Sequence, residues 1–160
     1  GAEPVEWMDR MPMVRAAFEE ALRLYPPAPS LNRAAIADDE WTSPDGKTGQ
    51  IAAGVTVLIM PWTLHRLQLY WDNPRAFMPE RFLPENRGKI GRFQYLPFGA
   101  GPRVCIGATF AMQEAVIALA VLMSRYRFDM TPDTKPWPVQ KLTTQPRDGL
   151  PIRVTRRVRP

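Results

Sequence analysis

The sequence predicts an α+β fold in which two main helices and several short antiparallel strands are joined by long stretches of coil. Two segments, 12–25 and 108–126, repeat apolar residues with the period of a helix. Short apolar or β-branched runs next to glycine or proline, such as 55–60, are typical of strands. Eighteen prolines, many of them clustered, indicate coil between short elements. A chain of 160 residues with 45% hydrophobic residues is long enough for one domain with a core.

The first helix is expected at residues 12–25. Pro12 suits the first turn of a helix, and apolar side chains from Val14 to Tyr25 then recur on one face. The proline pair at 26–27 ends the helix, because proline clashes with the preceding turn.

Short strands are expected between residues 33 and 60. The candidates are 33–37 and 55–60, with a turn at 44–46 between them. A short helix is expected at 62–67. Residues 68–96 show no clean period, so this stretch is predicted to be a long irregular meander, and such stretches are usually functional.

The strongest helix pattern spans 108–126, and its nearly all-apolar middle predicts a buried helix. Strand-like pieces follow at 127–130, 141–145 and 152–155. A turn at Pro146-Arg147-Asp148-Gly149 separates the last two, which predicts a terminal hairpin over 140–156.

Composition narrows the possible partners. The net charge of +5 and four arginines in the last eight residues are compatible with an acidic partner or a solvated tail. No nucleic-acid-binding signature is present, so a nucleic-acid partner is not expected.

Residues 1–10 lack a signal-peptide pattern, and the longest apolar run, 115–123, is too short to span a bilayer. A cytoplasmic location is therefore expected, and the start without methionine resembles a cut or processed end.

The single cysteine, Cys105, lies in a loop at 97–107 that directly precedes the second main helix. Unpaired N–H groups and the dipole at a helix start favour a thiolate. Arg103 adds a cation that suits an anionic ligand. Three glycines, which allow close backbone approach, and two stiffening prolines shape the same loop; they are Gly99, Gly101, Gly107, Pro97 and Pro102.

Several chemistries compete for this loop. The glycine spacing and the lack of lysine do not suit a phosphate loop, and no arginine follows the cysteine as in cysteine phosphatases. A Cys–His nucleophile would need the only histidine, His65, to meet Cys105 in space. The sequence has too few cysteine and histidine residues to form a zinc site. A buried structural cysteine is the commonest alternative, and the surrounding glycines, prolines and arginine argue against it.

Residues 98–107 match the haem-binding signature of the cytochrome P-450 family, phenylalanine-glycine-x-glycine-x-arginine-x-cysteine-x-glycine, at every defined position. Residues 20–23 resemble the family's glutamate-x-x-arginine motif, and 79–82 resemble its meander motif. The resemblance covers essentially the whole chain. It implies the C-terminal portion of the cytochrome P-450 fold, a single partial domain over 1–160.

The resemblance also implies residue roles. Cys105 would be the thiolate ligand of the iron in haem b, and Arg103 and Arg33 would contact haem propionates. Phe98 would pack near the thiolate, and Gly99, Gly101 and Gly107 would turn backbone N–H groups towards the sulfur. Positions that match the family's substrate contacts are Ala28, Pro29, Ser30 and Leu142.

Glu20, Arg23 and Arg81 match the family's salt-bridge triad, to which we assign a structural role because buried ion groups are costly unless fully paired. His65 is expected to be a packing or hydrogen-bonding residue rather than a ligand. Ala52 departs from the family, which often has proline there.

The implied function is a monooxygenase that inserts one oxygen atom from O₂ into a small organic substrate. Electrons would come from a ferredoxin or a flavoprotein reductase.

The distal helix and the pocket roof of the family are absent from this sequence. The resemblance therefore implies a segment of a longer enzyme, or a chain completed by a separate N-terminal part. That part would also hold any membrane anchor. A stand-alone haem-thiolate module is the third implied arrangement. The isolated chain is expected to lack coupled activity. The alternatives are a non-catalytic haem-binding or electron-transfer module, and an apo fragment that acts only as an interaction partner.

Overall fold

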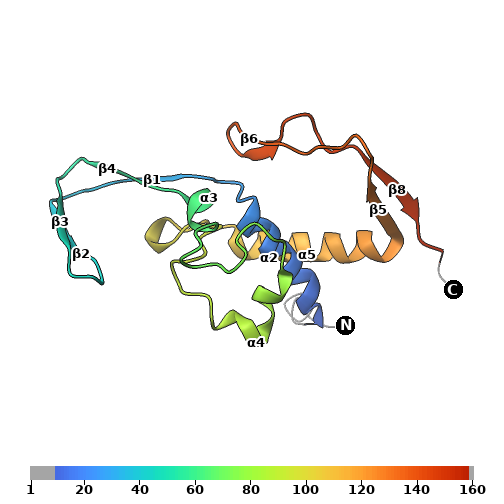
Figure 1. Cartoon of the computed structure of the whole chain (residues 1–160), viewed down its shortest axis with the longest axis horizontal. Coiled ribbons are helices and arrows are strands. Elements are labelled where there is room, and N and C mark those ends of the chain that lie inside the picture. Colours follow the sequence, from blue (N-terminus) through green and yellow to red (C-terminus); the bar gives the residue numbers. More distant parts are fainter. Residues whose placement is uncertain (1–9, 159–160) are drawn as a thin grey trace.

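The computed structural model describes residues 10–158 and contains helices and short antiparallel strands separated by coil (Figure 1). The α+β class predicted from the sequence is confirmed. The helical elements are α2 (Pro12–Leu24), α3 (Pro61–Leu64), η1 (Pro79–Phe82), α4 (Pro84–Arg87), η2 (Gly101–Arg103) and α5 (Ala108–Arg125). The strands are β1 (Leu31–Ala34), β2 (Asp39–Thr42), β3 (Thr48–Ile51), β4 (Thr56–Ile59), β5 (Tyr126–Met130), β6 (Pro138–Gln140), β7 (Thr144–Pro146) and β8 (Ile152–Arg156).

The strands of the described chain form four separate antiparallel pairs rather than one sheet. β1 pairs with β4, β2 with β3, β5 with β8, and β6 with β7. Each pair is too small to bury much apolar surface, so its position depends on the helices and loops beside it.

Helix α2 begins at Pro12, which fits the first turn because its missing N–H needs no partner there. It ends at Leu24, one residue earlier than the predicted 12–25. Its buried face combines apolar Ala16 and Leu22 with three charged residues, Glu19, Glu20 and Arg23. This face packs against η1 and α5, and Figure 1 shows α2 crossing α5.

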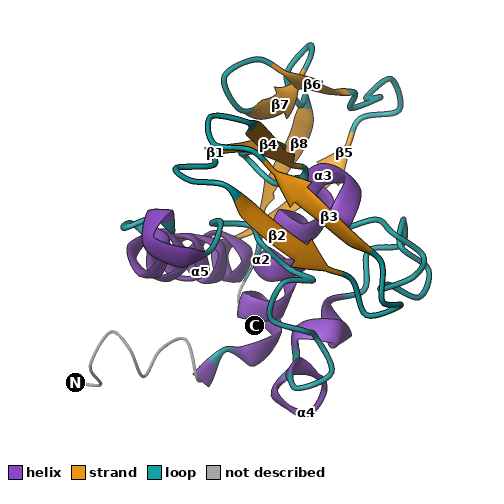
Figure 2. Ribbon diagram, turned by 90° about the vertical axis from the view of Figure 1, so that its left-hand side faces the viewer, coloured by secondary structure: helices purple, strands orange, loops and turns teal. Residues whose placement is uncertain are grey.

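The segment after α2 contains one strand pair more than the sequence patterns predicted. Strands β1 and β4 correspond to the expected strands at 33–37 and 55–60, with shifted ends. The predicted turn at 44–46 connects β2 and β3 in a hairpin that the patterns did not reveal, because its strands are exposed and polar. Figure 2 views the molecule with this hairpin towards the reader.

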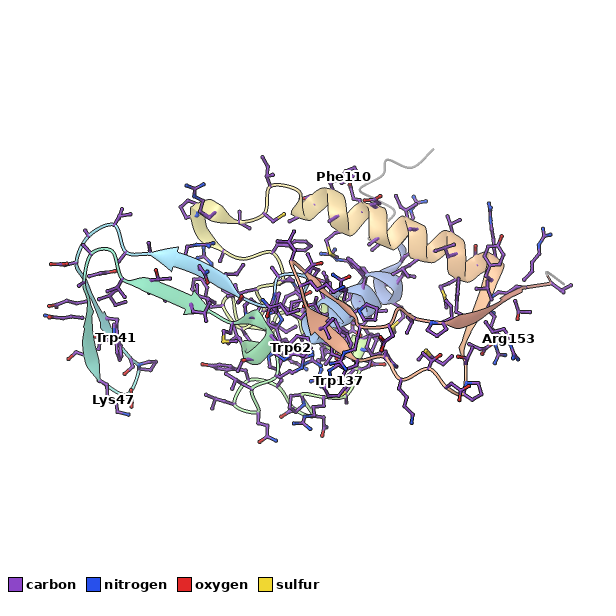
Figure 3. The ribbon with its side chains drawn as sticks, turned by 90° about the horizontal axis from the view of Figure 1, so that it is seen from above. Trp41, Lys47, Trp62, Phe110, Trp137 and Arg153 are labelled. Carbon is purple, nitrogen blue, oxygen red and sulfur yellow. The ribbon has the colours of Figure 1, made fainter. Side chains whose placement is uncertain are left out.

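One cross-strand pair of the hairpin is closely packed. Trp41 lies opposite Gly49, and a Cβ added at Gly49 would lie 2.6 Å from the indole ring. The indole therefore covers the glycine backbone. Trp41 and Lys47 lie at the end of the molecule far from Arg153 (Figure 3).

The meander at 68–96 is irregular, as expected, and contains only the short helices η1 and α4. It supplies most of the apolar core, in which Trp71 and Phe82 pack with Ala16 of α2. The Phe82 and Tyr95 ring centroids are 4.8 Å apart. The short helix expected at 62–67 is α3, which begins and ends earlier.

Helix α5 extends to Arg125, close to the predicted 108–126, but the prediction that it is buried is wrong for this chain. Val116 is its only buried residue; the helix packs mainly against α2 and β5, and most of its surface is open within the described chain. By length and apolar composition α5 is the one described helix that could cross a membrane, with 6% of it buried. The core helix of a soluble protein meets the same criteria, so this is weak evidence of a span.

The expected terminal hairpin at 140–156 is also wrong. Residues 141–143 form the turn between β6 and β7, so the expected strand at 141–145 spans a turn. The last strand, β8, pairs with β5 over five residues. This arrangement follows from the chain path, since β5 continues directly from α5 and offers the longer partner.

Candidate functional site

The cysteine loop is closed by its own backbone. The N–H of Cys105 donates to the carbonyl of Phe98 at 2.9 Å, and the N–H of Val104 donates to Gly101 at 3.0 Å. The N–H of Ala108 then bonds to the Cys105 carbonyl at 3.3 Å, at the start of α5. These bonds hold an exposed thiol directly before the helix start.

Two of the three glycines in this loop have conformations that favour glycine. Gly99 and Gly101 have φ angles of +77° and +72°, in the left-handed region. Gly107 has φ −87°, which any residue adopts, and a Cβ there would make an ordinary 3.9 Å contact with the Cys105 sulfur. Nothing within the described chain therefore requires glycine at 107.

The sulfur of Cys105 receives no hydrogen bond from a backbone N–H within residues 10–158. The expectation that the three glycines turn N–H groups towards the sulfur stays a prediction. The loop instead uses its N–H groups to bond its own carbonyls, as the Cys105–Phe98 bond shows.

Strand β1 brings Arg33 to the cysteine loop. A Cβ at Gly99 would lie 3.9 Å from the Arg33 guanidinium and 3.5 Å from Leu31. Arg33 bonds only to the adjacent Asn32 carbonyl, and within the described residues neither Arg33 nor the exposed Arg103 has a carboxylate partner. Arg33 thus faces Gly99 of the loop that carries the exposed thiol, and Arg103 belongs to that loop; guanidinium groups and a thiol suit a ligand that is anionic and needs a soft donor atom.

The predicted triad is assembled behind the loop. Glu20 and Arg23 are fully buried and form a two-point contact with N–O distances of 2.7 and 2.8 Å. Arg81 is more distant, with its Nε 3.5 Å from Glu20 Oε1 and no hydrogen bond at that nitrogen. The triad therefore consists of one tight pair and one looser cation.

Arg23 also connects α2 to the meander. Its guanidinium donates to three backbone carbonyls, those of His65, Pro74 and Ala76, at 2.7 to 3.0 Å. A buried guanidinium is tolerable only when its N–H groups are satisfied, and here all five have a partner. The pair thus ties the meander to the helix.

The predicted substrate-facing residues do not all lie together. Pro29 lines a cavity of about 270 Å³ with Met60, Trp62 and residues of β6 and β7. The N–H of Thr144 bonds to the Pro27 carbonyl at 2.9 Å, which brings β7 next to the segment of Ala28 and Ser30. Leu142, at the turn between β6 and β7, is 95% exposed and does not line this cavity.

Sequence reasoning missed a second buried acid, Glu19. Arg87 contacts it at 3.1 Å and Arg15 at 3.6 Å, while burial raises its pKa. Its carbonyl accepts a hydrogen bond from the Tyr95 hydroxyl at 2.9 Å, and burial also raises the Tyr95 pKa. The adjacent acids in a helix otherwise apolar on that face were the available signal.

The family model of cytochrome P-450 matches residues 4–152, almost the whole chain. The chain belongs to the cytochrome P-450 family. The crystal structure of the cytochrome P450DA heme domain superposes with a TM-score of 0.84 and 30% identity, over 99% of this chain and 33% of that one.

Curated relatives agree with this membership. The chain is 40% identical to cyclooctatin synthase of Streptomyces melanosporofaciens, over 89% of this chain and 30% of that protein. It is 37% identical to leukotriene-B4 omega-hydroxylase 3 of Mus musculus, over 96% of this chain and 29% of that protein. The chain thus spans about 30% of the length of these relatives.

Cytochrome P-450 proteins bind haem, and the residues present here fit that group. The thiol of Cys105 is exposed and held by the loop, and Arg33 and Arg103 have guanidinium groups without a carboxylate partner in the described residues. Thiolate is an established axial ligand of haem iron, and arginine pairs well with carboxylates such as propionates.

Proposed function

We propose that this chain supplies the thiolate side of a haem monooxygenase of the cytochrome P-450 family. The observation that supports this most strongly is the exposed Cys105 in a self-closed loop. The proposal assigns Cys105 as the ligand of haem b, and Arg33 and Arg103 as the contacts of its propionates. A reducing cytoplasmic location suits a chain whose one thiol has this role.

When bound, haem supplies the chemistry that inserts one oxygen atom from O₂ into an organic substrate, with two electrons from a donor protein. The residues of this chain would hold and orient the reacting groups. Cys105 would be the residue that holds the iron, and the bonds from 96 to 108 fix the path of the backbone around its thiol. Arg33 and Arg103 would neutralise the propionates.

The substrate class proposed is a small organic molecule. The cavity between Pro29, Trp62 and Thr144 supports a contribution of this segment to the substrate side. The Thr144 hydroxyl is buried without a partner there, so it is available to a polar substrate group. An acidic ferredoxin or flavoprotein reductase suits the net charge of +5. The proposed activity is that of the assembled family fold rather than of this chain alone.

The absorption spectrum of the reduced, carbon monoxide-treated protein tests the ligand. We expect the red-shifted Soret band of haem-thiolate proteins, its loss in Cys105→Ala, and its retention in the control Ile106→Ala, which alters the neighbouring exposed side chain. Haem uptake without this band would contradict thiolate ligation and favour a non-catalytic haem-binding module. No uptake would favour an apo interaction partner.

A further inference from the structure

His65 is completely buried where three segments meet: the end of α2, the end of α3 and the residues that lead into the cysteine loop. Its Nε2 accepts the N–H of Leu96 at 2.8 Å, and its Nδ1 lies 3.2 Å from the carbonyl oxygen of Arg23. Its own carbonyl accepts from the Arg23 guanidinium at 2.7 Å. His65 is therefore bonded to α2 twice and to the loop entrance once.

These partners determine which ring nitrogen carries the proton. A backbone N–H only donates, so Nε2 facing Leu96 must be unprotonated. A backbone carbonyl only accepts, so Nδ1 facing Arg23 must carry the proton. The ring is thus neutral, and both of its nitrogens are used.

Leu96 transmits this attachment into the cysteine loop. Its carbonyl accepts the N–H of Gly99 at 3.2 Å, and the next bond, from Cys105 to the Phe98 carbonyl, closes the loop. The bond between the His65 ring and Leu96 and these two backbone bonds thus connect His65 to Cys105. Tyr95 provides a separate attachment to α2 through Glu19.

We propose that His65 is a positioning residue for the iron-ligating thiolate, and that it acts by holding the Leu96 N–H so that the cysteine loop keeps one backbone conformation. This inference rests on the proposed function of Cys105.

The surroundings of His65 keep the ring in the required neutral form. Arg23 of α2 and Arg66, the next residue after His65, are both cationic neighbours. The ring centroids of Tyr95 and His65 are 5.3 Å apart, with the two rings tilted. Burial and these cations lower the His65 pKa to about 4. The ring therefore stays an acceptor for Leu96 throughout the neutral range.

Two substitutions separate the two ring nitrogens. An amide oxygen in His65→Gln reaches the position of Nε2 and can still accept from Leu96, whereas the shorter side chain in His65→Asn reaches only the position of Nδ1 and can still bond Arg23. We expect the thiolate-type Soret band of the reduced carbon monoxide complex to be retained in His65→Gln. In His65→Asn the ratio of the thiolate-ligated to the thiol-ligated form should fall about tenfold, which corresponds to the loss of one buried hydrogen bond. Tyr95→Phe, which removes the neighbouring attachment only, serves as the control and should retain the band.

The outcomes on haem-loaded protein are distinct. A wild-type protein without the band contradicts the proposed function, whereas an unchanged band in His65→Asn overturns the positioning role. His65 is the only histidine, so ¹⁵N-histidine labelling of untagged protein reports on it alone and needs no variant. We expect the neutral Nδ1–H form at pH 7, and a charged or Nε2–H ring would overturn the inference independently of the haem.

Discussion

Arg23 shows how a single buried charge can connect a helix to an irregular segment far away in sequence. Its five N–H groups bond to Glu20 and to three carbonyls that lie more than forty residues away in sequence. The planar guanidinium suits this task because its donors have fixed directions. The Glu-x-x-Arg spacing predicted the pair, since residues three apart share a helix face.

Replacing Arg23 by lysine should therefore be severely destabilising. Arg23→Lys keeps the charge but loses the planar set of donors, which leaves Glu20 and backbone carbonyls unpaired. We expect a loss of about 3 to 5 kcal/mol in the free energy of unfolding, measured by urea denaturation. The exposed Arg125→Lys should change it by less than about 0.5 kcal/mol. Equal effects of the two variants would contradict the assigned role.

His65 makes stability depend on pH. Its pKa falls from 6.5 to about 4 on folding, so the unfolded chain binds a proton more readily. The His65 contribution is complete above pH 6.5 and is lost as the pH falls towards 4, by roughly 3 kcal/mol in total. The difference in unfolding free energy between wild type and the non-titrating His65→Gln should follow this curve. A flat difference between pH 4 and 7 would contradict it.

Among the elements, the cysteine loop is the one most constrained by backbone geometry. Gly99 combines a positive φ with a position beside β1, where an added Cβ would make ordinary contacts with Leu31 and Arg33. The β2–β3 hairpin, in contrast, has only its own cross-strand pair and stands apart from the other elements (Figure 1). The loop therefore depends on tertiary contacts and the hairpin does not.

An alanine at position 99 tests this constraint. Gly99→Ala places a Cβ on a left-handed residue, and the strain should cost about 1 to 2 kcal/mol of stability. Gly88→Ala, at φ −65° and with no atom within 4 Å of the new Cβ, is the matched control and should be neutral or slightly stabilising. Thermal unfolding of both variants gives the comparison, and a stable Gly99→Ala would show that the loop tolerates another conformation.

For the whole molecule, the balance between core and surface is unusual. The core consists of a few residues of α2 and the meander, while many large apolar side chains of α5 and the tail are exposed. Figure 3 shows Phe110 on the outer side of α5, where it is 69% exposed. The chain spans about 30% of its relatives' length.

An open apolar face should make the chain self-associate. We expect Phe110→Asp to lower the self-association seen by sedimentation without lowering the unfolding free energy, because the side chain is already in water. Thr109→Asp adds the same charge next to it without removing an apolar group. If both variants reduce association equally, charge rather than the apolar face is responsible.

Local patterns in the sequence were sufficient for the Glu20–Arg23 pair and the two main helices, because each depends on residues within a few positions of one another. Which of the three glycines in the cysteine loop has a positive φ was not predictable, since spacing alone does not reveal φ.

Only the tertiary structure decided which distant groups meet. The contact of Arg33 with Gly99, the bond from Leu96 to His65, the pairing of β8 with β5 and the exposure of α5 all join or separate residues far apart in the chain. Such contacts depend on how whole surfaces pack and on which surfaces are present to pack. The periodicity of a sequence indicates that a helix has apolar faces, but it does not indicate whether another part of the protein packs against them.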